Sequence, residues 1–161
     1  MPRLNRFHEA QNSDYAGFDA ALEEIRAGGK RGHWIWYVFP QISGLGSSSA
    51  AREFAIDGRE EAEDYLRDAT LASRLLTITR EVAGQLAGGT PLRALMGSDI
   101  DAKKLVSSLT LFGEVAKTLG QREGGETCRQ IAAVAGEALA VAELQGYPPC
   151  AYTLRRLRGE T

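Results

Sequence analysis

Residues 99–120 read DIDAKKLVSSLTLFGEVAKTLG, and the choice between a helical and a mixed fold depends on them. Their apolar side chains recur every three or four residues, as one face of an α-helix requires, and they are Leu105, Leu109, Phe112, Ala116 and Leu119. The inner segment 105–112 also has the composition of a strand, but it lies inside the longer helical pattern. We therefore predict a helix that ends at Gly120.

The segment His33–Pro40, HWIWYVFP, is the densest apolar run in the chain and follows neither the helical nor the strand period. Periodicity cannot separate a buried strand from a buried helical turn in a run this short. A sheet would have two candidate strands at most, and two strands alone are only marginally stable. The sequence thus predicts an all-α protein, with a short irregular or 3-10 segment at 33–40.

Helical spacing accounts for most of the remaining sequence, with glycine pairs and prolines at the boundaries. The segments with this pattern are 4–11, 15–25, 50–56, 59–68, 71–86 and 126–144, and a short basic tail follows from 152. The chain has 161 residues, which is an ordinary size for one domain. We predict a single multihelical domain over 1–161 with seven or eight helices.

Composition excludes several classes of function. The 19 basic residues against 21 acidic ones give a net charge of −2, so nucleic acid is not an expected partner. The chain has no apolar run long enough for a membrane helix, and its start lacks a secretory signal, so we expect a cytoplasmic protein. Cys128 and Cys150 have no ligand spacing, and we predict free thiols with no metal or cofactor.

Three motifs carry a resemblance to a known family. They are NxFxxAQ at 5–11, KxxHWxWxxFPQxxGLG at 30–46 and DxxKLxSSxTLF at 101–112. Together they resemble a family of small bacterial proteins, an all-helical domain of unknown function, some of whose members automated annotation labels "calpastatin". The resemblance covers 4–116 and implies a multihelical fold with no established activity. The segment 121–161 departs from the family pattern.

The calpastatin label conflicts with the composition of the chain. A calpastatin is an extended inhibitor that becomes ordered on its protease, and such segments are poor in aromatic and aliphatic clusters. The aromatic block 33–40 has the opposite character. Protease inhibition is therefore not the function that we expect.

The aromatic block with the following glutamine, 33–41, and the helix over 101–112 are candidates for the walls of a ligand pocket. Aromatic faces beside cations can hold a base and its phosphate, and a glycine turn before a helix can bind an anion. The candidate ligand-binding residues are Lys30, His33, Trp34, Trp36, Gln41, Gly44, Gly46, Lys104, Ser107 and Ser108. We predict a small anionic, nucleotide-like metabolite. The alternatives are aromatic core packing, an ordinary serine N-cap and an Asp–Lys pair on the helix surface.

Catalysis is left open by the sequence. Histidine is the usual general acid or base of enzymes, so His33 is a candidate for that role, and Ser108 follows Lys104 by one helical turn, which is one way to activate a nucleophile. The chain has no GxSxG elbow of an α/β-hydrolase. A different class of function is a non-enzymatic interaction module, in which the aromatic residues dock a partner protein or a second copy of the chain.

Overall fold

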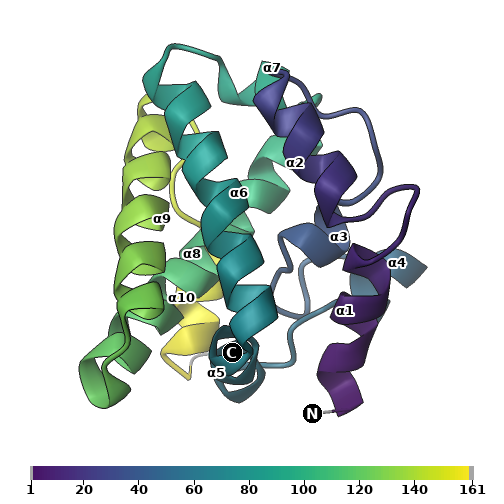
Figure 1. Cartoon of the computed structure of the whole chain (residues 1–161). Helices are drawn as coiled ribbons and strands as arrows, with labels where there is room; N and C mark the ends of the chain where they lie inside the picture. The colour runs from purple at the N-terminus through teal and green to yellow at the C-terminus, as the bar shows by residue number, and fades with distance from the viewer. Residues whose placement is uncertain (1, 160–161) are drawn as a thin grey trace.

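The structure is a computed structural model that describes residues 2–159. These residues form ten α-helices and one 3-10 helix (Figure 1). In chain order they are η1 (Pro2–Leu4), α1 (Asn5–Gln11), α2 (Phe18–Arg26), α3 (Ile35–Val38), α4 (Ser49–Glu53), α5 (Arg59–Arg67), α6 (Ala69–Ala87), α7 (Leu92–Met96), α8 (Asp99–Glu123), α9 (Glu126–Leu144) and α10 (Ala151–Leu157). The described residues contain no strand, only an isolated parallel bridge between Ile42 and Ile56. The predicted all-α class is confirmed.

Helix α8 is the centre of the fold. It packs against α9, α5, α7, α10 and α3, while α6 packs against α9 and α2 (Figure 1). The side chain of Ser98 caps its first turn by accepting the N–H of Asp101 at 3.1 Å. Every residue from 105 to 112 is buried, because neighbours cover the helix on several sides. A helix covered in this way is apolar around most of its circumference, which explains the strand-like composition of this segment.

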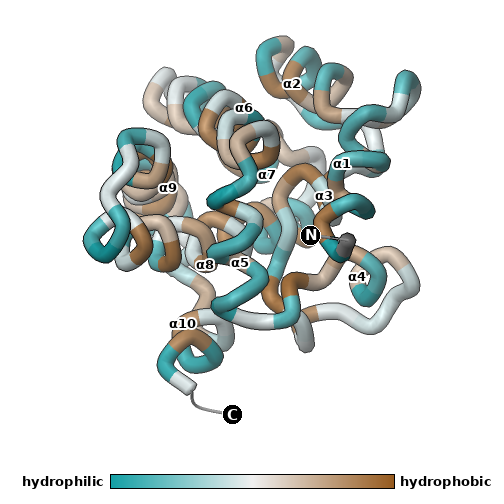
Figure 2. Tube along the Cα trace, turned by 60° about the horizontal axis from the view of Figure 1, so that its bottom comes forward, coloured by the Kyte–Doolittle hydropathy of each residue, from teal (hydrophilic) through white to brown (hydrophobic). Residues whose placement is uncertain are grey.

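The segment 33–40 contains a single α-helical turn, α3, where the sequence predicted an irregular or 3-10 segment. The turn stops at Phe39, whose φ and ψ of −125° and 73° are non-helical, because a residue before proline avoids the helical region. Trp34 and Phe39 are fully buried. Most of the aromatic block therefore belongs to the core, and Figure 2 shows the apolar character of α3.

The described residues contain ten helices against the predicted seven or eight, because short helices form outside the main periodic segments: α3 and α7 have only four and five residues. The predicted basic tail contains a further helix, α10. The buried apolar residues form one cluster that runs from Leu4 to Ala142. None of the helices within residues 2–159 combines the length and the apolar character that crossing a membrane requires.

Helix α10 holds the glycine-rich segment that follows the aromatic block. The Tyr152 hydroxyl and the Arg156 guanidinium both donate to the carbonyl oxygen of Ser43, at 3.0 and 2.6 Å. Arg156 also donates to the carbonyl of Asp57 at 3.2 Å. Gly44 has a φ of +99°, and a Cβ there would overlap the Tyr152 hydroxyl. Only glycine fits both the backbone conformation and the contact.

Candidate functional site

Two of the predicted ligand residues, Lys30 and Lys104, pair with the carboxylate of Asp101, and two more, Trp34 and Trp36, lie beside these lysines. The Lys30 ammonium lies 2.7 Å from Asp101 Oδ2, and the Lys104 ammonium lies 3.8 Å from Oδ1. Lys30 Nζ is 5.1 Å from the centre of the Trp34 ring, and Lys104 Nζ is 4.7 Å from that of Trp36. We call these five residues the tryptophan–lysine cluster. It holds two cations and one anion, so it keeps a formal positive charge.

Much of this cluster is engaged within the fold. The Lys30 side chain is 6% exposed and also donates to the Gly32 carbonyl at 2.6 Å. Trp34 Nε1 donates to Glu24 Oε1 at 3.0 Å, and the same oxygen accepts the N–H groups of Arg31 and Gly32. Burial raises the pKa of Glu24, but these hydrogen bonds outweigh it and lower the pKa overall. The loop before α3 is thus fixed to α2.

Trp36, Gln41, Gly44 and Gly46 line one small cavity of about 20 Å³. That space is enough for about one water molecule. The indole N–H of Trp36 is buried and has no hydrogen-bond partner among the described residues. A nucleotide does not fit this cavity unless the segment 43–48 moves.

The two candidate catalytic residues lie in different environments. His33 is exposed on the loop before α3. Ser108 is fully buried, and its hydroxyl has no hydrogen-bond partner in the described part of the chain. The described contacts include no hydrogen bond between the two. Ser107, one position earlier on α8, donates to the Lys103 carbonyl at 3.0 Å and lines a different, larger cavity.

This larger cavity lies between α8 and the segment that joins α9 to α10, and we call it the α8–Cys150 cavity. Its volume is about 300 Å³. Its lining is mostly apolar and consists of Lys103, Val106, Ser107, Gly146, Tyr147, Pro148 and Cys150. Small-molecule sites have volumes of about 300–1,000 Å³, apolar walls and a few polar groups. The α8–Cys150 cavity has these properties.

Polar contacts hold the walls of the cavity in place. The Tyr147 hydroxyl donates to Asp99 Oδ1 at 2.6 Å, while the Lys103 ammonium lies 3.2 Å from Oδ2. The Cys150 N–H donates to Thr110 Oγ1 at 3.1 Å, and Thr110 is itself buried. The segment 147–150 is therefore attached to α8 at two points, one on each side of the cavity.

Cys150 is chemically different from the other cysteine. Burial raises the pKa of the Cys150 thiol, but the nearby Ser107 and Thr153 hydroxyls and backbone N–H groups, which can donate to the thiolate, outweigh burial and lower the pKa overall. Burial and the nearby Glu123 raise the pKa of Cys128. Both cysteines are free, as predicted. The spacing of the cysteines gave no sign that Cys150 meets Ser107.

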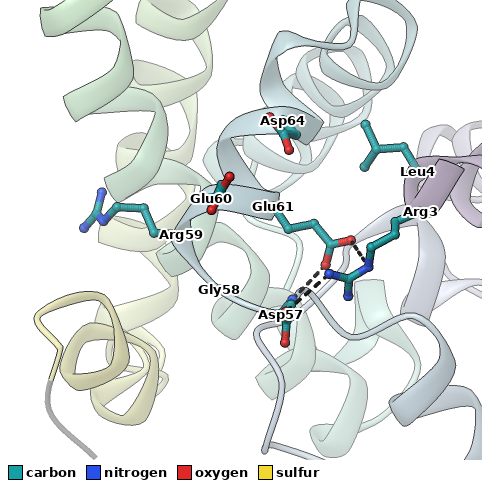
Figure 3. A pocket seen from close by; sticks show the side chains of 8 residues that line it. All are labelled: Arg3, Leu4, Asp57, Gly58, Arg59, Glu60, Glu61 and Asp64. Carbon is teal, nitrogen blue, oxygen red and sulfur yellow. Dashed lines mark hydrogen bonds and ion pairs between the residues drawn. The ribbon is translucent and has the colours of Figure 1, made fainter. Parts of the chain in front are cut away.

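A further cavity, of about 390 Å³, lies where the first helical turn of the chain meets the start of α5 (Figure 3). Four carboxylates and two guanidinium groups line this cavity. Its net charge is therefore negative, which disfavours an anionic ligand. Glu61 is committed to Arg3, Arg6 and the Asp57 N–H, and Arg59 points away toward Thr118. Within residues 2–159 no group of three or more acidic, histidine or cysteine side chains could hold a metal ion.

Comparison with known proteins is consistent with this fold. Residues 1–123 match a family model described as "Protein of unknown function (DUF1810)". The crystal structure of the conserved hypothetical protein Rv1873 from Mycobacterium tuberculosis is similar, with 39% identity and a TM-score of 0.64 over 82% of this chain and 96% of that one. No protein of curated function matches. The family match ends with α8, so one wall of the α8–Cys150 cavity lies inside it and the other outside.

Proposed function

The chain belongs to the DUF1810 family of proteins of unknown function, which supplies no activity to carry over, and we propose from its own geometry that it binds a small molecule in the α8–Cys150 cavity. The ligand is largely apolar and carries one small anionic group such as a carboxylate. The observation that carries this proposal is the apolar 300 Å³ cavity, with Lys103 as its one charged lining residue.

The positive charge of Lys103 is the reason for proposing that the ligand carries an anionic group. Its side chain is 69% exposed and pairs with Asp99, which does not line the cavity. Exposed ion pairs of this kind contribute about 0–1 kcal/mol, so a ligand carboxylate can exchange for Asp99 at little cost. The Ser107 hydroxyl offers a second polar contact. The apolar body of the ligand would lie against Val106, Tyr147 and Pro148.

A binding experiment tests the proposal. Hexanoate, octanoate and 3-phenylpropanoate are titrated into the full chain by calorimetry, with their primary amides as neutral controls. Lys103→Met should weaken carboxylate binding roughly tenfold or more, because a hydrogen bond to a charged group contributes about 1.5–3 kcal/mol, and it should leave amide binding unchanged. Lys117→Met, at another exposed lysine of α8, is the matched control.

Filling the cavity gives the second arm of the experiment. Ser107→Met places an apolar side chain where the ligand would lie and should abolish binding of acids and amides alike. If no compound binds, or if Ser107→Met leaves binding intact, the proposal is wrong. A concentration-dependent dimer in light scattering, together with no binding, would instead favour the interaction module.

A second candidate is a nucleotide-like anion at the tryptophan–lysine cluster. The indole N–H of Trp36, which is buried and has no hydrogen-bond partner among residues 2–159, favours it, together with the residual positive charge beside Lys104. Nucleotides would then raise the melting temperature of the chain, and His33→Ala and Lys104→Ala would remove that shift. Stabilisation that persists in both variants would rule this site out.

A further inference from the structure

We propose that Cys150 is a thiol that exchanges with small disulfides, and that the α8–Cys150 cavity is thereby a site of reversible thiolation. The proposal shares its cavity with the proposed function but does not require that a carboxylate ligand binds there. It rests on the access of the thiol, on two hydroxyl groups around it, and on the space available to an attached group.

Access distinguishes the two cysteines. The side chain of Cys150 is partly exposed and forms part of the cavity wall, whereas Cys128 is 8% exposed and packs into the core between α8 and α9. In disulfide exchange, the attacking sulfur must approach along the axis of the S–S bond that breaks, so the incoming disulfide needs open space beside the thiol. The cavity provides that approach for Cys150, and the core denies it to Cys128.

Two hydroxyl groups, those of Ser107 and Thr153, lie close enough to the Cys150 sulfur to lower its pKa. Thr153 lies one turn further along α10 and is fully buried, and its hydroxyl has no hydrogen-bond partner within residues 2–159. Ser107 approaches from α8 and is 8% exposed. A thiolate is a much stronger acceptor than a thiol, so loss of the proton gives the unpartnered Thr153 hydroxyl an acceptor.

The electrostatic surroundings of Cys150 also favour the thiolate over the thiol. Burial alone would raise the pKa of Cys150, but the hydroxyl and backbone donors lower it overall. The thiolate is the nucleophile in disulfide exchange, and a lowered pKa increases its population near neutral pH. Reactive cysteines occupy partly exposed sites of this kind, and inert ones are buried as Cys128 is.

The chemical step is balanced without any further reagent. The Cys150 thiolate attacks one sulfur of a small disulfide R–S–S–R, and the S–S bond of that disulfide breaks. A new Cys150–S–S–R bond forms, and RS⁻ leaves and takes a proton from water. The disulfide is the oxidant, and a second thiol reverses the step. The attached group would occupy the cavity, with Lys103 beside any carboxylate that it carries.

The test uses the full chain and 5,5′-dithiobis(2-nitrobenzoate), a disulfide that carries carboxylates and releases a coloured thiolate. Cys128→Ser retains only Cys150, and Cys150→Ser retains only Cys128. We expect the first variant to react at least roughly tenfold faster than the second at neutral pH. Intact mass spectrometry after treatment with cystine should find one adduct, on Cys150.

The pH dependence separates a tuned thiol from one that is merely exposed. In the Cys128→Ser background, Ser107→Ala and Thr153→Val should each move the midpoint of the rate profile to higher pH, because each removes a hydroxyl that can turn to donate to the thiolate. Urea unfolding checks that both variants fold. Equal rates at the two cysteines, or a midpoint that neither variant moves, would overturn the proposal. A reactive Cys150 with no carboxylate binding would refute only the proposed function.

Discussion

Substitution of Gly44 by alanine should loosen α10 from the body of the protein. Gly44 combines a φ of +99° with a position directly under the Tyr152 side chain. An alanine Cβ would be strained by the backbone and would also overlap the Tyr152 hydroxyl. Tyr152 would have to move, and its hydrogen bond to the Ser43 carbonyl would be lost.

The expected cost follows from these two effects. A non-glycine residue in the left-handed region costs about 1–2 kcal/mol. Insertion of an atom into a filled contact costs about 1–3 kcal/mol. We therefore expect Gly44→Ala to lower the free energy of unfolding by about 3 kcal/mol. For a chain of this length, that corresponds to a decrease in melting temperature of roughly 6–12 °C.

Gly28 provides the matched control. Its φ is +94°, but no atom lies within 4 Å of the position of an added Cβ. Gly28→Ala should therefore show only the backbone cost of about 1–2 kcal/mol. In a Tyr152→Ala background, Gly44→Ala should fall to the same value, because the overlapping hydroxyl is gone. Urea unfolding of the single and double variants measures both differences.

Two results would refute this reasoning. The first is equal destabilisation by Gly44→Ala and Gly28→Ala, which would mean that Tyr152 yields without cost. The second is a double variant whose cost is the sum of the single costs within about 0.5 kcal/mol, which would mean that residues 44 and 152 do not interact.

Two further predictions concern buried charge. Lys30→Met should lower the free energy of unfolding by about 3 kcal/mol in urea titrations, since it removes one partner of a largely buried ion pair and leaves Asp101 behind; a loss below about 1 kcal/mol would contradict the role of that pair. Burial raises the pKa of Asp68, but hydrogen bonds from the Leu71 N–H and His8 outweigh it and lower the pKa overall. Asp68 therefore stabilises the fold above its unfolded pKa, and this contribution is lost as the pH falls below about 4. Asp68→Asn should flatten that part of the plot of stability against pH. Because asparagine is also a good N-cap residue, the variant should preserve α6.

The fold class was predictable because the information is local. The apolar stripe of 99–120 needs no knowledge of its neighbours to indicate a helix, and the capping serine marks its start. The predicted end at Gly120 was wrong, because α8 continues through that glycine to Glu123 and ends before Gly124. The helical turn in 33–40 was not predictable in detail. The conformation of this segment depends on its burial against other helices and on Pro40, and neither effect produces a periodic pattern of apolar residues in the sequence.

The candidate site was predictable only in part. The motifs identified Lys30, the two tryptophans and Lys104, and the structure brings these residues together around Asp101. Sequence alone could not show that Lys30 is neutralised by a residue far along the chain. The same limit hid the cavity at Cys150, because its two walls come from segments with no motif in common.

The contact between α10 and the glycine-rich segment can form only near the end of synthesis. The hydrogen bond from Arg156 to Ser43 joins residues 113 positions apart. At about 5–20 residues per second, a ribosome needs roughly 6–23 s to reach residue 156 after residue 43. During that interval the segment around Gly44 has no cover from α10, and most of the buried core residues, which lie between Ile56 and Ala142, are still being made. A chaperone or protease that recognises this segment therefore has a window of seconds on the nascent chain, and the window closes when the last helix docks.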